Sequence, residues 1–170
     1  MKHILLAISF LATSISCTLG QADGPDILAI EKLGSLKVGI KEKDLGPILG
    51  KSPVIKGKVV EEGATGDFVS TWTCAEKGLS LHMSSGQTKK GAKTVRGFTA
   101  TAKCTLATAK GIKIGSKKAD VVKAYKAFES KDTNEASPPG SFVAGSVYGG
   151  IIFSFKDGKV SEIFFGAAAE

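Results

Sequence analysis

Two stretches of the chain carry nearly the same pattern: GIKIGSKKADVVKAYKAF, from Gly111 to Phe128, and SLKVGIKEKDLGPILG, from Ser35 to Gly50. When the two are aligned, lysines, an aspartate and the apolar positions fall together. Three more pairs of blocks follow in the same order: GDFVS (66–70) with GSFVA (140–144), GLSLHM (78–83) with GIIFSF (150–155), and VRGF (95–98) with VSEI (160–163). Four matched blocks in one order indicate an internal repeat.

The repeat predicts an α+β fold. Each unit is expected to contain one helix followed by three antiparallel strands, and the two units to form one helix-covered antiparallel sheet. Residues 23–106 are predicted to be repeat unit 1 and residues 107–170 repeat unit 2, together one compact domain.

The two helices are predicted from apolar spacing and from cap signals. Val121, Tyr125 and Phe128 lie at helical spacing and form a core face, with lysines pointing away from it. Ser116 is the candidate cap of this helix. In unit 1, Asp44 is expected to cap a shorter helix that Gly50 ends.

Strands are predicted where apolar and polar residues alternate. In 98–106, Phe98, Ala102 and Cys104 are expected to share the inner face. In 79–84, His82 is expected to face solvent. The pair Asp157-Gly158 predicts a tight hairpin.

The motifs GIKIGSKKADVVKAY and LKVGIKEKDLGPILGKSP resemble the β-lactamase inhibitory protein and its relatives, over nearly the whole chain after the first residues. A single unit is similar to the small outer-membrane assembly lipoproteins of the SmpA/OmlA type. The resemblance implies two helix-plus-sheet units joined into one curved sheet, whose concave face and hairpin loops contact a partner protein. The sequence has no residues that match the family's target-gripping positions, so inhibition of a β-lactamase is not carried over.

The first residues have the order of a secretory signal peptide. A basic start, an apolar run and small residues lead to expected cleavage after Ala22, so residues 1–22 are assigned as the signal. The alternative is a lipoprotein anchored at Cys17. The protein is expected to be exported, either periplasmic or secreted, and no later stretch is long and apolar enough to be a transmembrane segment.

The charge and the basic residue type narrow the class of partner. The formal net charge is +7, yet Arg96 is the only arginine. Because arginine supplies the planar contacts to phosphates and bases, nucleic acid is not an expected partner. An acidic protein or an anionic envelope polymer is expected instead, while a purely solubilising role of the charge stays open.

The sequence offers little for catalysis. His82 is the single histidine beyond the signal, and one histidine with two cysteines is a poor zinc set. No phosphate-binding glycine loop is present. The chain is therefore predicted not to be an enzyme, with no catalytic, cofactor-binding or metal-binding residues.

Cys74 and Cys104 are the two cysteines beyond the signal. In an exported protein they are expected to form a disulfide. If they lie on strands one apart in a flat meander, the separation of about 10 Å is too long for a bond. Two buried thiols are the alternative.

Two long loops are candidate contact segments. Residues 84–97 contain Lys89, Lys90, Lys93 and Arg96 without an acid, and they are the predicted partner-binding residues. Residues 129–141 form a polar loop with two prolines. Both could also be tolerated insertions, in which case the contact surface is expected on the sheet face at Thr99, Thr101 and Lys103.

Two functions are expected from these features. The first is an exported, non-enzymatic protein-binding module, with an inhibitor of a secreted or periplasmic enzyme as one form of it. The second is a cell-envelope-associated assembly or adhesion factor that binds anionic envelope components.

Overall fold

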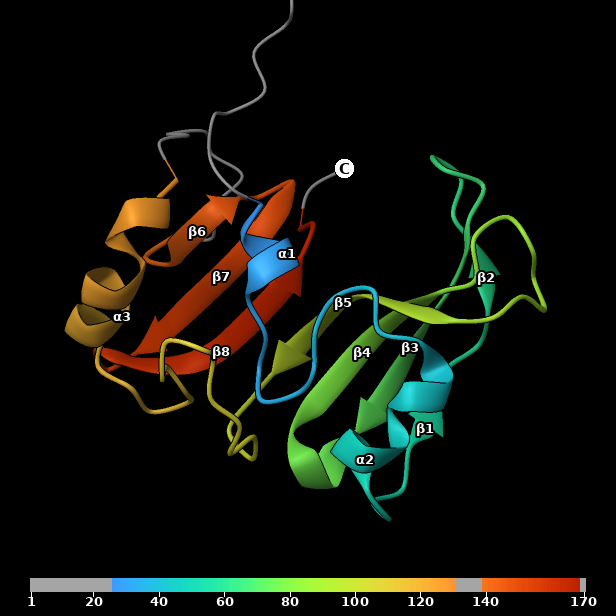
Figure 1. Ribbon diagram of the computed structural model, residues 1–170, viewed down its shortest axis with the longest axis horizontal. Coiled ribbons are helices and arrows are strands. Elements are labelled where there is room, and N and C mark those ends of the chain that lie inside the picture. The colour runs from blue at the N-terminus through green and yellow to red at the C-terminus, as the bar shows by residue number, and fades with distance from the viewer. Residues whose placement is uncertain (1–25, 131–138, 169–170) are drawn as a thin grey trace, which may run out of the picture.

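The computed structural model describes residues 26–130 and 139–168. They form an antiparallel sheet with a few short helices (Figure 1). The strands are β1 (Ile55–Lys56), β2 (Val60–Glu61), β3 (Phe68–Cys74), β4 (Leu79–Ser84), β5 (Thr94–Ala100), β6 (Phe142–Ser146), β7 (Gly149–Lys156) and β8 (Lys159–Gly166). The α-helices are α1 (Ile27–Ile30), α2 (Gly46–Leu49) and α3 (Lys118–Tyr125), and 3-10 turns span Glu42–Asp44, Ala75–Lys77 and Lys126–Phe128.

The prediction of an antiparallel sheet is confirmed. The strand order is β1-β3-β4-β5-β8-β7-β6, and β2 pairs with β3 beside β1. The matched sequence blocks lie on β3 and β6, on β4 and β7, and on β5 and β8. Two three-stranded meanders therefore meet where β5 pairs with β8.

The expected signal peptide, residues 1–22, and the alternative lipid anchor at Cys17 lie outside the residues that the structure describes.

The segments that lead into the helices make the same backbone bonds in both halves. The N–H of Gly39 donates to the carbonyl of Val95 at 2.7 Å, and the N–H of Gly115 donates to that of Val160 at 2.8 Å. Each valine N–H donates in turn to the residue after the glycine, at 2.9 and 2.8 Å. Both glycines have positive φ, +83° and +86°, a conformation that costs glycine little and other residues more.

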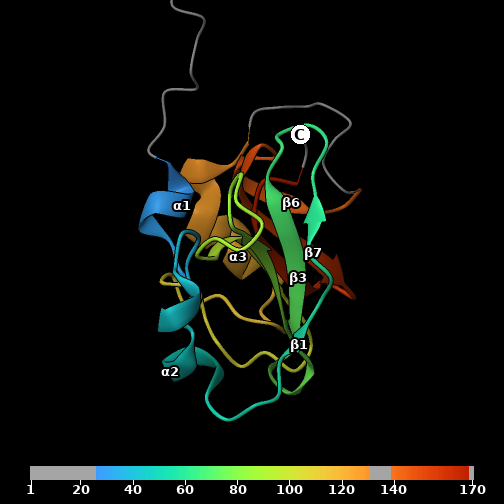
Figure 2. The same ribbon diagram turned by 90° about the vertical axis from the view of Figure 1, so that its right-hand side faces the viewer.

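The main core lies on one face of the sheet, which we call the core face. Figures 1 and 2 show α1 and α2 on the same side of the strands. Helix residues Ile27, Leu49, Val121 and Tyr125 belong to the same buried cluster as alternate residues of the strands. At the centre, the rings of Phe98 and Phe165 stack 4.5 Å apart where β5 meets β8.

The helix faces and the end of α2 at Gly50 were predicted correctly, and the N-terminal caps were not. Val121 and Tyr125 are buried, as expected from their spacing. Ser116 does not cap α3, because its hydroxyl accepts the N–H of Lys113 instead. Asp44 does not cap α2 either. It ends a 3-10 turn, and the helix begins only at Gly46, one residue before Pro47.

The strand expected over 98–106 was predicted too long. β5 ends at Ala100, because the next N–H, that of Thr101, donates to the carbonyl of Gly78 and the chain turns. Ala102 is consequently exposed and Cys104 lies buried after the turn. The hairpin at Asp157-Gly158 is confirmed, since Lys156 and Lys159 pair across it.

Candidate functional site: a groove beside Arg96

The face of the sheet opposite the core, which we call the open face, carries the alternate strand residues. On β4 it holds His82, between the buried Leu81 and Met83. On β8 it holds Phe164, which packs in a second, smaller cluster with Val143, Val147 and Ile152. Side chains alternate along a strand, so this second cluster is separated from the main core by the sheet itself.

A β-bulge places Arg96 on this part of the sheet. Along β4 and β5, His82 pairs with Gly97 but Met83 pairs with Val95, which leaves Arg96 as the additional residue. Bulges re-aim side chains and often lie near functional sites. The neighbour Gly97 has to be glycine, because a Cβ atom there would lie 2.8 Å from the carbonyl oxygen of Phe165.

The guanidinium of Arg96 is held by an ion pair with Glu62, which follows β2. Their Nη1 and Oε2 atoms are 2.7 Å apart, and both side chains are largely buried, at 31% and 21% exposed. The same carboxylate oxygen accepts the hydroxyl of Thr65 at 2.8 Å. A partly buried, charge-assisted bond of this kind is stronger than one in open solvent.

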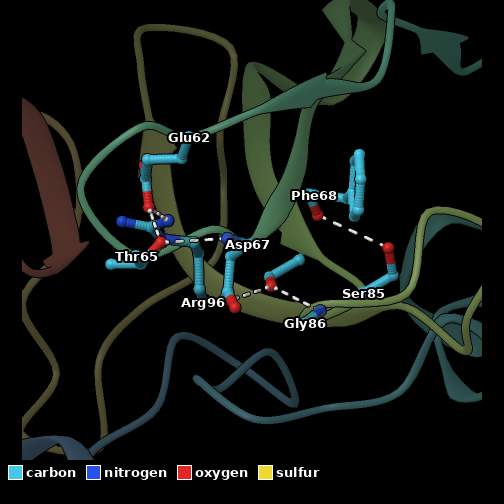
Figure 3. A network of polar contacts seen from close by, with 8 residues as sticks. Glu62, Thr65, Asp67, Phe68, Ser85, Gly86 and Arg96 are labelled. Atoms are coloured by element: carbon cyan, nitrogen blue, oxygen red, sulfur yellow. Dashed lines mark hydrogen bonds and ion pairs between the residues drawn. The ribbon is translucent and has the colours of Figure 1, made fainter.

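This ion pair belongs to a larger network at one end of the sheet (Figure 3). The N–H of Asp67 donates to the Thr65 hydroxyl at 3.2 Å, and the Asp67 carboxylate accepts the hydroxyl of Ser84 at 3.1 Å. The Ser84 oxygen accepts the N–H of Gly86 at 3.0 Å. The network therefore ties the turn after β2 to the start of the loop between β4 and β5.

A groove of about 610 Å³ opens beside the ion pair. Its titratable lining comes from Lys58, Glu62, His82 and Arg96, with Ser70 and Thr71 as further polar residues. Apolar lining comes from residues of β2, β3 and β8: Val60, Val69 and Phe164. This volume lies in the range of ligand pockets, about 300 to 1,000 Å³. Among the residues that the structure describes, the groove thus combines two cations and one carboxylate with apolar side chains.

His82 lies in this groove and is half-buried, where a solvent-facing position was expected. Burial lowers the pKa of its imidazole below 6.5, and the positive charge of Arg96 lowers it further. Its ring meets the ring of Phe164 edge-on, with centroids 6.1 Å apart. The imidazole is therefore neutral at pH 7 and contributes hydrogen-bonding atoms without charge.

The four predicted partner-binding residues do not form one group. Lys89 and Lys90 are exposed in the loop of residues 85–93, and Lys93 is partly buried at its end, where its carbonyl accepts the N–H of Glu42 at 2.8 Å. Arg96 lies in β5 and is paired with an acid. The expectation of four cations without a nearby acid is therefore wrong for Arg96, because the pairing acid is 34 residues away in sequence.

The expected disulfide is not present in the structure. Cys74 and Cys104 are free thiols, and both are buried in the main core. Cys74 ends β3 and Cys104 follows the turn after β5, with β4 between the two strands. Burial raises the pKa of the Cys104 thiol, which makes it less reactive as a thiolate.

The alternative surface at Thr99, Thr101 and Lys103 is split between two elements. Thr99 lies on the open face of β5, while Thr101 and Lys103 are exposed in the turn that follows.

Within residues 26–130 and 139–168, no three His, Cys, Asp or Glu side chains gather closely enough to hold a metal ion. The same residues contain no helix long and apolar enough to cross a membrane.

Sequence reasoning missed Glu62, Lys58 and Phe164 as site residues. One signal was available in the sequence. When the blocks VRGF and VSEI are aligned, Arg96 corresponds to Ser161, so a charged residue stands where the other block has a small one.

Compared with known proteins, the chain matches no family model, no curated protein and no solved structure.

Proposed function

We propose that the protein is an exported, non-enzymatic module that binds an acidic partner protein through the end of the sheet that carries the loop of residues 85–93. One observation carries this proposal. The hairpin of β7 and β8 closes with Asp157-Gly158 alone, whereas β4 and β5 are joined by this longer loop with exposed lysines. A connection that the second hairpin does without, and that concentrates charge, suits partner contact.

We also infer that the chain is a tandem repeat, in which α2 and α3 are corresponding helices on the core face. The support comes from the mirrored strand order around β5 and β8 and from the matched bonds of Gly39 and Gly115. Each of the two central hairpins also has one register shift, between His82 and Met83 in the first and between Ser154 and Phe155 in the second.

The test of the binding surface is a matched pair of charge variants. In the first, Lys89, Lys90 and Lys93 are all replaced by Gln. In the control, three exposed lysines before, within and directly after α3 are replaced in the same way: Lys113, Lys123 and Lys126. Both variants lose the same charge. Five of the six lysines are exposed and Lys93 is partly buried, and charges at the surface contribute little to stability, so both variants should unfold much like the wild type.

The wild type is used as bait on envelope and secreted fractions, and the captured protein is then measured against all three forms. We expect the loop variant alone to bind more weakly, mainly through a slower on-rate, and the difference to shrink as salt screens the attraction. Equal losses in the loop variant and the control would refute a specific surface at this loop.

A further inference from the structure

Three lysines lie directly opposite one another where the β7–β8 hairpin meets the start of α3 (Figure 1). Lys156 and Lys159 pair across the hairpin, and Lys159 also forms an antiparallel bridge with Lys117, the residue before α3. Directly opposite residues of antiparallel segments have their Cβ atoms about 5 Å apart, on the same face. The three side chains therefore form one row about 10 Å long, which we call the lysine row.

The lysine row is electrostatically unfavourable in the free protein. All three side chains are exposed, and like charges placed directly opposite each other destabilise a sheet. None of the three makes an ion pair with another residue of the described ranges 26–130 and 139–168. Asp157 lies between two of them in the turn but is not paired with either. The positive charge of the row is thus left for solvent or for a ligand.

The first hairpin builds an equivalent row with one lysine. There, Lys41 bridges Thr94, and Thr94 pairs with Ser84 across β4 and β5. In both rows, the N–H of the residue after the bridging lysine donates to the carbonyl of the residue before its partner, at 2.8 Å in the first row and 2.9 Å in the second. The same backbone geometry therefore forms with Thr and Ser, and the sheet does not require the second and third lysines.

The start of α3 adds to the positive potential of the row. Lys117 is the N-cap residue, and an ammonium group has no acceptor with which to cap the first N–H groups of a helix. Those N–H groups carry partial positive charge, so a cation beside them is unfavourable, and Asp120 in the first turn offsets only part of it. An anion bound at the row would be attracted by the lysines and by the helix together.

We propose that the lysine row binds a linear chain of phosphate groups. The row lies in the other half of the chain from the loop of residues 85–93, and this inference does not rest on the proposed function. Bound phosphates would remove the repulsion between the lysines, so the arrangement that lowers stability in the free protein becomes favourable in the complex.

The residue type and the spacing favour phosphate over carboxylate. Lysine is a compact point charge that suits phosphate, whereas the planar fork that matches a carboxylate belongs to arginine, which the row lacks. In an extended acidic peptide, the carboxylates on one side are about 7 Å apart, because every second side chain points away. Phosphate groups that share an oxygen lie closer together, so several of them can face the three cations at once.

The probe is a fluorescently labelled, short-chain inorganic polyphosphate, titrated with the purified protein at about 0.15 M salt. Polyglutamate of equal charge tests the need for phosphate, and orthophosphate at the same phosphate concentration tests the need for linked groups. We expect polyphosphate to bind at least about 10-fold more tightly than either. Equal binding of polyglutamate would overturn the phosphate assignment and indicate an acidic protein as the ligand of the row.

Two triple variants of equal charge test the place of binding. The row variant replaces Lys117, Lys156 and Lys159 by Gln, and the control is the variant at Lys113, Lys123 and Lys126 described above. The row variant should bind polyphosphate at least about 10-fold more weakly, while the control should lose about 2-fold or less, because salt screens charges that do not touch the ligand. Equal losses would show that binding follows net charge alone and would overturn the site.

A single substitution separates a binding role from a structural one. Lys159→Thr gives the second row the side chain that Thr94 supplies in the first. We expect it to raise the melting temperature by about 1 to 3 °C at low salt, with a smaller gain at about 0.15 M because the repulsion is then screened. Polyphosphate binding should weaken at least about 3-fold. A lower melting temperature, or unchanged binding, would overturn the proposal.

The loop variant at Lys89, Lys90 and Lys93 keeps this inference apart from the proposed function. It should bind polyphosphate like the wild type, and polyphosphate should raise its melting temperature but not that of the row variant. If the loop variant loses polyphosphate binding and the row variant does not, the lysine row is not the site, while the proposed binding of a protein at the loop stands.

Discussion

Replacing Tyr125 by Phe tests how far one buried hydrogen bond holds the N-terminal segment on the sheet. The hydroxyl of Tyr125 donates to the carboxylate of Glu31, and both residues are buried, the glutamate at 4% exposure. The two residues come from opposite halves of the chain. The phenylalanine ring keeps the contact with Phe153, whose centroid is 5.0 Å away, so the substitution removes only the hydroxyl.

The expected magnitude follows from the charge of the acceptor. A hydrogen bond to a charged group contributes about 1.5 to 3 kcal/mol, and a buried carboxylate that loses a donor retains its desolvation cost. We therefore expect Tyr125→Phe to lower the free energy of unfolding by about 2 to 3 kcal/mol. With a urea m-value of about 2 kcal/mol/M, the midpoint falls by about 1 to 1.5 M.

The assay is urea unfolding followed through the fluorescence of Trp72, the single tryptophan, which is buried in the core. The other tyrosine supplies a matched control, because Tyr148 is 63% exposed and its hydroxyl is free to bond water. Tyr148→Phe should change the free energy of unfolding by less than about 0.5 kcal/mol. A similarly small change for Tyr125→Phe would refute the reasoning, since it would mean that the carboxylate of Glu31 does not depend on this donor.

Alkaline pH provides a second readout of the same bond. Burial and the hydrogen bond to Glu31 raise the pKa of Tyr125 well above its ordinary value of 10. The folded protein therefore keeps the proton where the unfolded chain releases it, and this contribution is complete below pH 10 and is lost as pH rises beyond it. The wild type should lose stability above pH 10 more steeply than Tyr125→Phe.

Two further predictions concern titratable side chains. Because burial and Arg96 lower the pKa of His82, the unfolded chain binds a proton before the folded one. Stability should fall as pH drops from about 6.5 to 5, and thermal melts of His82→Gln should show a flatter profile over that window. Cys74 and Cys104 are buried free thiols, so in a protein expressed without residues 1–22 iodoacetamide should label neither in the native state and both in concentrated guanidinium without reductant. An unlabelled mass under denaturing conditions would indicate a disulfide.

The features that the sequence predicted correctly are those set by nearby residues. The buried face of α3 followed from the spacing of Val121 and Tyr125, and the β7–β8 hairpin followed from Asp157-Gly158. Helical periodicity and turn conformation depend on residues within a few positions of each other, so a short stretch of sequence is enough to predict them. The alternation along 79–84 gave the inner face of β4 for the same reason.

The candidate site depended on contacts between distant residues, which only the tertiary structure decided. Arg96 was assigned to a basic loop because its partner, Glu62, is 34 residues earlier in the chain. Glu31 and Tyr125 are 94 residues apart, and although helical spacing marks Tyr125 as buried, nothing local marks the carboxylate of Glu31 as its hydrogen-bond acceptor. The sequence by itself determined the buried face of α3, the alternation along β4 and the β7–β8 hairpin. The pairing of strands, the bulge at Arg96 and the groove arose when sheet formation brought these residues together, because that step is decided by the free energy of the whole packed core and not by any one segment.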